Sequence, residues 1–228
     1  MYTRITARCQ MACKHCCMNA TAKGQDMTRE TFLAACKLSE DRGDTIFLGG
    51  GEPSLHPLLF DFIGLALAHD TSGTGPGAVG IVTNGGVTKI ALKLAEMARH
   101  GLIACELSQD AWHDPIDPAV VKAFTKKPSP ESYGVYGTKT DDHDYRGIRS
   151  VKEPYRQGRW KSGKAECACV ELCIEPDGRI FACGCRKVQY GTVFNPQIPD
   201  TYQSGECGKN QPQPEVEEVT ADKELVTA

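Results

Sequence analysis

The segment "ITARCQMACKHCCMNA" (residues 5–20) contains four cysteines, three of which are spaced as Cys9, Cys13 and Cys16. Thiols so close together in one soluble loop bind a metal, form disulfides or are neighbours by coincidence. Three thiolates are one fewer than a closed tetrahedral zinc site or a fully ligated four-iron cluster needs. The spacing is therefore suited to a metal centre with one position open. A zinc site with Cys17 as the fourth ligand is the alternative.

The composition limits the classes of protein to which this chain can belong. The chain has 228 residues, 40% hydrophobic and 24% charged, with 12 cysteines and a formal net charge of −3. This charge disfavours a nucleic-acid binder. No apolar run approaches the roughly 20 residues of a membrane span, and the first twenty residues lack a signal-peptide core. We expect a cytoplasmic protein without membrane contact, whose cysteines serve metal or redox chemistry rather than disulfides.

Short apolar runs alternate with helical patterns over the first half of the chain. Strands are predicted at residues 2–8, 45–48, 79–83 and 102–107, and helices at 28–43, 57–70, 87–101 and 117–126. Gly43 is the expected C-cap of the first helix. This alternation predicts an α/β fold with a parallel sheet or barrel. Residues 128–164 are rich in proline, glycine and charge, and at most one or two short strands are predicted there, one of them at 133–138.

A polar or glycine-rich segment follows each predicted strand. The cysteine loop follows the first, "GGGEP" (49–53) the second, "TNGG" (83–86) the third and "SQDAWHD" (108–114) the fourth. The carboxyl ends of parallel strands share one edge, where ligands bind. We therefore expect the four segments to meet in one site.

The four segments together resemble the radical S-adenosylmethionine (radical SAM) superfamily. "CQMACKHC" (9–16) has its CxxxCxxC spacing, and the three later segments are similar to its Gly-Gly-Glu, Thr-Asn-Gly and Ser-x-Asp…His-Asp segments, in the same order, over residues 1–115. The resemblance implies a partial, shortened (β/α) barrel. It also implies that Cys9, Cys13 and Cys16 hold a 4Fe-4S cluster whose open iron binds SAM.

The resemblance further implies the SAM contacts and the reaction. Residues 50–52 match the motif that receives the methionyl amino group, and His15 matches the adenine contact. The full set of implied cofactor-binding residues is His15, Gly50, Gly51, Glu52, Asn84 and Ser108. An electron from a flavodoxin or a ferredoxin would split SAM into methionine and a 5′-deoxyadenosyl radical, which removes hydrogen from the substrate.

A second group of cysteines lies in "CACVELCIEPDGRIFACGC" (167–185). "PDG" (176–178) predicts a hairpin turn between two apolar arms, which would bring Cys169 opposite Cys185, with Cys167 and Cys183 nearby. The segment resembles the start of a SPASM or twitch extension, but the later cysteine run of that extension is absent. We expect at most one auxiliary iron–sulfur site, with zinc as the alternative. Its candidate ligands are Cys167, Cys169, Cys183, Cys185 and Cys207, with Cys183 preferred.

These interpretations divide the chain into a partial barrel (1–150), a small cysteine-rich β-hairpin extension (151–207) and a flexible acidic tail (208–228). The expected function is a radical SAM enzyme that abstracts hydrogen from a peptide or protein side chain. One alternative is a radical SAM enzyme that modifies a nucleotide or a cofactor. Another is a noncatalytic iron–sulfur or zinc-binding module, which would need neither "GGGEP" nor SAM.

Overall fold

The computed structural model describes residues 1–69, 78–125, 144–150, 159, 171–205 and 210–214. These form one nine-stranded sheet in the order β5-β4-β3-β2-β1-β6-β7-β8-β9. The strands are β1 (Tyr2–Thr6), β2 (Phe47–Gly50), β3 (Gly80–Thr83), β4 (Ala104–Ser108), β5 (Arg146–Arg149), β6 (Cys173–Ile174), β7 (Arg179–Phe181), β8 (Gln189–Thr192) and β9 (Asn195–Pro196). The helices are α1 (Arg29–Arg42), the 3₁₀ turn η1 (Pro53–Leu55), α2 (Leu59–Ala68), α3 (Thr88–Arg99) and α4 (Pro118–Phe124).

The centre of the sheet is parallel. β1 through β5 pair side by side in parallel, and β6 pairs in parallel with the other edge of β1. β6 to β9 then form an antiparallel meander. Within the described residues β5 and β9 do not meet, so the sheet stays open. The expected α/β fold with a partial barrel is confirmed.

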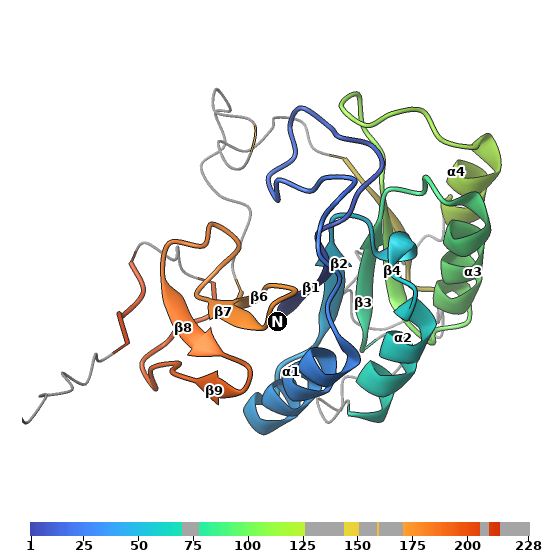
Figure 1. Ribbon diagram of the computed structural model, residues 1–228. Coiled ribbons are helices and arrows are strands. Elements are labelled where there is room, and N and C mark those ends of the chain that lie inside the picture. Colours follow the sequence, from blue (N-terminus) through green and yellow to red (C-terminus); the bar gives the residue numbers. More distant parts are fainter. Residues whose placement is uncertain (70–77, 126–143, 151–158, 160–170, 206–209, 215–228) are drawn as a thin grey trace, which may run out of the picture.

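The helices follow the sheet in order from α1 to α4 (Figure 1). Thr28 caps α1 by accepting a hydrogen bond from the Thr31 amide, and Gly43 ends it in the left-handed conformation (φ 65°), as predicted. Pro118 begins α4 behind the capping side chain of Asp117. The ends of both helices lie within two residues of the predicted bounds.

Several strands differ from the sequence-based expectation: β1 ends at Thr6 rather than at residue 8, β4 begins at Ala104 rather than at residue 102, and β8 and β9 were not predicted. β2 includes Gly49 and Gly50, which were predicted to belong to the following loop. A Cβ at Gly49 would collide with the Tyr2 ring, so glycine lets β2 approach β1 closely. β5 (Arg146–Arg149) was not predicted, because this short edge strand is half-exposed and lacks an apolar run. The strand expected at 133–138 lies outside the described residues.

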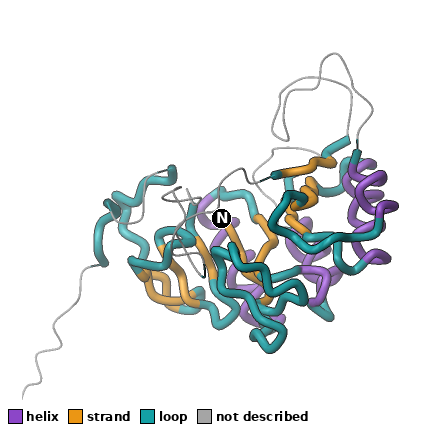
Figure 2. Tube along the Cα trace, turned by 90° about the horizontal axis from the view of Figure 1, so that it is seen from above, coloured by secondary structure: helices purple, strands orange, loops and turns teal. Residues whose placement is uncertain are grey.

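The two faces of β1 have different partners. Ile5 is buried in the main core between the sheet and the helices, where Phe32 of α1 and Phe62 of α2 stack with ring centroids 4.1 Å apart. Tyr2 lies on the opposite face, against a smaller cluster of Met18, Cys173 and Phe181. Seen from above, loops lie over the strands between the helices and the C-terminal strands (Figure 2). These loops include the cysteine loop and the segments that follow β2, β3 and β4, which form the candidate site described below.

The predicted hairpin is present. β6 and β7 are antiparallel and joined across Gly178 (φ 85°), the glycine of "PDG". Because β6 pairs with β1, the sheet continues across the predicted domain boundary at residue 150. Gln211, in the predicted tail, is buried and donates a hydrogen bond to the Gln203 carbonyl. None of the described helices is long and apolar enough to cross a membrane.

Candidate active site

The cysteine loop leaves the carboxyl end of β1 and is anchored by its own backbone. The Cys9 amide donates to the Thr21 carbonyl (2.9 Å), and the Cys16 amide donates to the Cys13 carbonyl (3.2 Å). Cys9 is buried with Met11 and Ala20, and the partly buried Cys13 and Cys16 pack against the same small cluster. The three predicted ligands therefore gather at one place, at the edge of the sheet where the sequence predicted a site.

Gly50, at the end of β2, and Gly51, directly after it, allow a close backbone approach to the loop. A Cβ at Gly50 would collide with the Thr6 carbonyl oxygen, and one at Gly51 with that of Arg8. The Gly51 and Glu52 amides donate to these two carbonyls, each at 2.7 Å. Their observed role is thus to pair the 50–52 segment with the chain that enters the cysteine loop. The predicted contact with the methionyl amino group stays a prediction.

Glu52 connects the second strand to the third. Its side chain is completely buried, and Oε2 accepts from the Asn84 amide at 2.6 Å. Oε1 accepts from the Thr83 hydroxyl at 2.7 Å and from the Ser54 amide at 3.0 Å. Burial raises the pKa of Glu52, and these hydrogen bonds oppose the increase. The carboxyl group therefore holds the "TNGG" loop in place.

Asn84 contacts the cysteine loop directly. Its Nδ2 donates to Cys9 Sγ at 3.5 Å, and its Oδ1 accepts from Gln10 Nε2 at 3.0 Å. A Cβ at Gly86 would collide with Nε2 of the Gln10 side chain, so a larger residue there would displace that side chain from Asn84. Gln10 was not singled out from the sequence because the CxxxCxxC spacing specifies no residue at its position. Asn84 is thus brought together with Cys9, and Glu52 with Asn84.

The loop after β4 meets His15 across the site. The His15 and His113 rings lie edge to face with centroids 4.8 Å apart, and His113 Nδ1 is 2.8 Å from Asp110 Oδ1. Burial and the neighbouring His113 lower the pKa of His15, so its ring favours the neutral form. The buried His15 Nδ1 has no hydrogen-bond partner among the described residues. Ser108 is the last residue of β4 and lines a cavity of about 700 Å³ with Asp110 and His113.

Two kinds of ligand suit the group formed by His15, Asp110 and His113. One donor atom each from His15, Asp110 and His113 lies within 4.8 Å of the others, so the three could hold a metal ion. The neutral, partly buried ring of His15 could equally contact a purine. Asp110 and His113 were not predicted as site residues, although their i, i+3 spacing in "DAWH" was a usable signal.

The cysteine thiols fit a metal cluster. Burial, followed by the charges of Cys9 and Cys16, raises the pKa of Cys13 to about 11. Burial also raises the pKa of Cys9, and the negative charges of Glu52 and Cys16 raise it further. Thiolates this close together repel one another unless a cation neutralises them, and soft sulfur ligands suit iron or zinc.

The raised pKa of Cys13 predicts slow alkylation of the metal-free protein. At pH 8 we expect Cys13 to react with iodoacetamide about 100-fold more slowly than an ordinary thiol of pKa ~8.5, because its thiolate fraction is lower. The rate should keep increasing up to about pH 11. Mass spectrometry of the peptide that contains Cys13 measures this profile. A plateau near pH 9 would contradict the buried, mutually repelling thiols.

The second cysteine group is only partly described. Cys183 and Cys185 lie with their Sγ atoms 3.0 Å apart, in the loop after β7. Cys167, Cys169 and Cys207 lie outside the described residues, as does the predicted pairing of Cys169 with Cys185. The two described sulfurs are suitable soft donors for iron or zinc, and the rest of the ligand set stays a prediction.

Comparisons with known proteins identify the family and the fold. The family model of the radical SAM superfamily matches residues 3–133. Among solved structures, BtrN in complex with AdoMet and 2-DOIA superposes with a TM-score of 0.57 at 15% identity, covering 85% of this chain and 77% of BtrN. BtrN in an open conformation gives a TM-score of 0.50 at 16% identity, covering 91% and 86%. No curated protein sequence matches. Because the family model spans more than half of the chain, the protein belongs to the radical SAM superfamily.

Proposed function

We propose that this protein is a radical SAM enzyme whose first cluster is held by Cys9, Cys13 and Cys16. The observation that carries the proposal is the contact of Asn84 with Cys9, which joins the loops after β1 and β3 around three clustered thiols. Family membership supports an enzyme that uses SAM. The noncatalytic module is disfavoured, since a metal-binding loop alone needs no such bracing by Glu52.

The residues have separate tasks in this proposal. A 4Fe-4S cluster bound by the three cysteines would supply the electron that splits SAM into methionine and a 5′-deoxyadenosyl radical, which abstracts hydrogen from the substrate. Asn84 orients the Cys9 sulfur and offers polar atoms beside it. His15 offers a neutral ring to the adenine, and Ser108 a hydroxyl at the cavity wall. The 50–52 segment holds the site together and receives the methionyl amino group.

We infer that the substrate is a peptide or a protein side chain. The cysteine-containing loop after β7 supports this inference, as does the sheet, which is open within the described residues and would leave room for a large substrate. A flavodoxin or a ferredoxin serves as the reductant. Cys183 and Cys185, with cysteines outside the described residues, hold an auxiliary iron–sulfur cluster.

Anaerobic assays test the proposed reaction. Protein reconstituted with iron and sulfide is given dithionite and SAM, and 5′-deoxyadenosine is measured by mass spectrometry. We expect 5′-deoxyadenosine to form. We also expect exposure of the protein to air to abolish this activity, because an open iron is accessible to oxygen. A fully loaded protein that neither binds nor cleaves SAM would overturn the proposal.

Cys183→Ala tests the auxiliary cluster. We expect the variant to lose roughly half of the iron, since one of two clusters loses a ligand while the first keeps all three. Iron is measured per chain after reconstitution, with Cys105→Ala as the control, because Cys105 is a buried core residue of β4. Iron unchanged from wild type would argue against a cluster at Cys183.

A further inference from the structure

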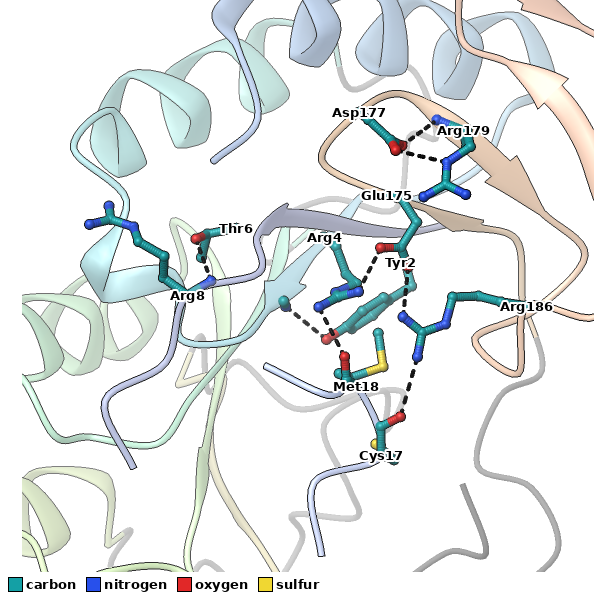
Figure 3. A network of polar contacts seen from close by, with 11 residues as sticks. Tyr2, Arg4, Thr6, Arg8, Cys17, Met18, Glu175, Asp177, Arg179 and Arg186 are labelled. Carbon is teal, nitrogen blue, oxygen red and sulfur yellow. Dashed lines mark hydrogen bonds and ion pairs between the residues drawn. The ribbon is translucent and has the colours of Figure 1, made fainter. Parts of the chain in front are cut away.

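Arginine side chains hold the end of the cysteine loop from outside it. Arg4 of β1 donates from Nη2 to the Met18 carbonyl at 3.1 Å. Arg186, which follows Cys185, lies with Nη2 3.5 Å from the Cys17 carbonyl. Figure 3 shows both guanidinium groups converging on the Cys17–Met18 segment from β1 and from the C-terminal strands. The chain directly after Cys16 is therefore held by groups far away in sequence.

Glu175 fixes both arginines. Its Oε2 is 2.6 Å from Arg4 Nη1, and its Oε1 is 3.3 Å from Arg186 Nη1. Arg4 and Glu175 are almost fully buried (3% and 7% of their side chains exposed), and Arg186 is 23% exposed. Tyr2 of β1 pairs with Cys173 of β6. Arg4 and Glu175 each follow two residues later, so they lie on the same face of the sheet as that pair. One carboxylate between two guanidinium groups leaves a net positive charge beside the loop.

Backbone strain is concentrated at the same place. Among the described residues, the non-glycine residues with positive φ are Ala12 (47°), Asn19 (53°) and Arg186 (57°). The first two belong to the cysteine loop, and the third is the residue whose side chain contacts it. Such conformations cost free energy and persist where the surroundings impose them, often at functional sites.

Arg186 also joins two sets of predicted metal ligands. It directly follows Cys185, and its hydrogen-bond acceptor, Cys17, directly follows Cys16. We propose that Arg186, anchored by Glu175, is a positioning residue that couples the C-terminal Cys183–Cys185 loop to the loop of the SAM-binding cluster. This inference rests on the proposed function. A reduced cluster carries one more negative charge, so the nearby guanidinium should favour it and raise its reduction potential.

The test compares Arg186→Gln and Arg186→Lys with Arg179→Gln. Arg179 lies on β7, is about half-exposed and pairs with Asp177, away from the cysteine loop, so it controls for charge removal from the same strands. Hydrogen exchange of residues 11–20 is measured on the metal-free protein. The potential of the first cluster is measured by an EPR-monitored titration of the reconstituted protein.

We expect Arg186→Gln to speed loop exchange roughly tenfold and to make the potential more negative. Lysine keeps the charge but cannot bridge Glu175 and Cys17 together, so Arg186→Lys should speed exchange while restoring most of the potential. Arg179→Gln should change neither. If Arg186→Gln behaves like Arg179→Gln in either measurement, the coupling is refuted. Should Arg186→Gln not fold, Arg186→Lys decides through loop exchange.

Failure of the two proposals is distinguishable. If the wild-type protein forms no 4Fe-4S cluster, the proposed function fails, while exchange in the metal-free protein still decides the loop contact. If the cluster forms and cleaves SAM, but Arg186→Gln leaves either the loop exchange or the potential unchanged, only the positioning role of Arg186 fails.

Discussion

Cys13→Ala is expected to reduce 5′-deoxyadenosine formation to background. Two remaining thiolates cannot hold a four-iron cluster with one open position, so the site that binds SAM is lost. Removing a residue that merely orients a metal ligand costs about 10–100-fold in affinity or activity, so removing a ligand should cost more. The measurement is 5′-deoxyadenosine per chain after anaerobic reconstitution with dithionite and SAM.

Cys36→Ala is the matched control. Cys36 is fully buried in α1, within the main core and outside the cysteine loop. Its replacement also removes one thiol, but it should cost only packing and leave SAM cleavage near the wild-type rate. Full cleavage by Cys13→Ala would show that the cluster is held differently. Equal loss in both variants would show that the assay reports folding rather than cluster ligation.

Glu52→Ala should destabilise the protein and weaken SAM binding together. The substitution leaves the buried Asn84 amide and the partly buried Ser54 amide without their acceptor and opens a cavity, at a cost of roughly 3–4 kcal/mol in the free energy of unfolding. Without this bracing, Asn84 is no longer held against Cys9. Denaturant unfolding of the metal-free protein measures the first effect, and SAM titration of the reconstituted protein the second.

Glu52→Gln separates hydrogen bonding from shape. Its amide oxygen can still accept from the Asn84 amide, but its NH₂ group cannot accept from the Ser54 amide. We expect a loss of about 1–2 kcal/mol in unfolding free energy and a smaller loss of SAM affinity. If Glu52→Ala unfolds like wild type, the carboxyl group is not the brace that the hydrogen bonds indicate.

The sequence alone determined the features that depend on neighbouring residues. The glycine at position 43 and the capping Asp117 end and begin helices through their own backbone and side-chain preferences. The three cysteines of the first loop lie within eight residues, so any fold keeps them close. The turn at 176–178 also depends on local backbone geometry, with Gly178 at positive φ.

Only the tertiary structure decided which distant segments meet. Nothing in the short strand Cys173–Ile174 indicates that it pairs with β1, and no local pattern links Arg4 to Glu175. Strand pairing over such separations is selected by burial of the whole sheet and by satisfaction of its buried charges, which act after the elements have formed. For the same reason the sequence predicts the first cysteine loop, but it does not predict the arginines that hold this loop. Their contacts depend on the pairing of β6 with β1.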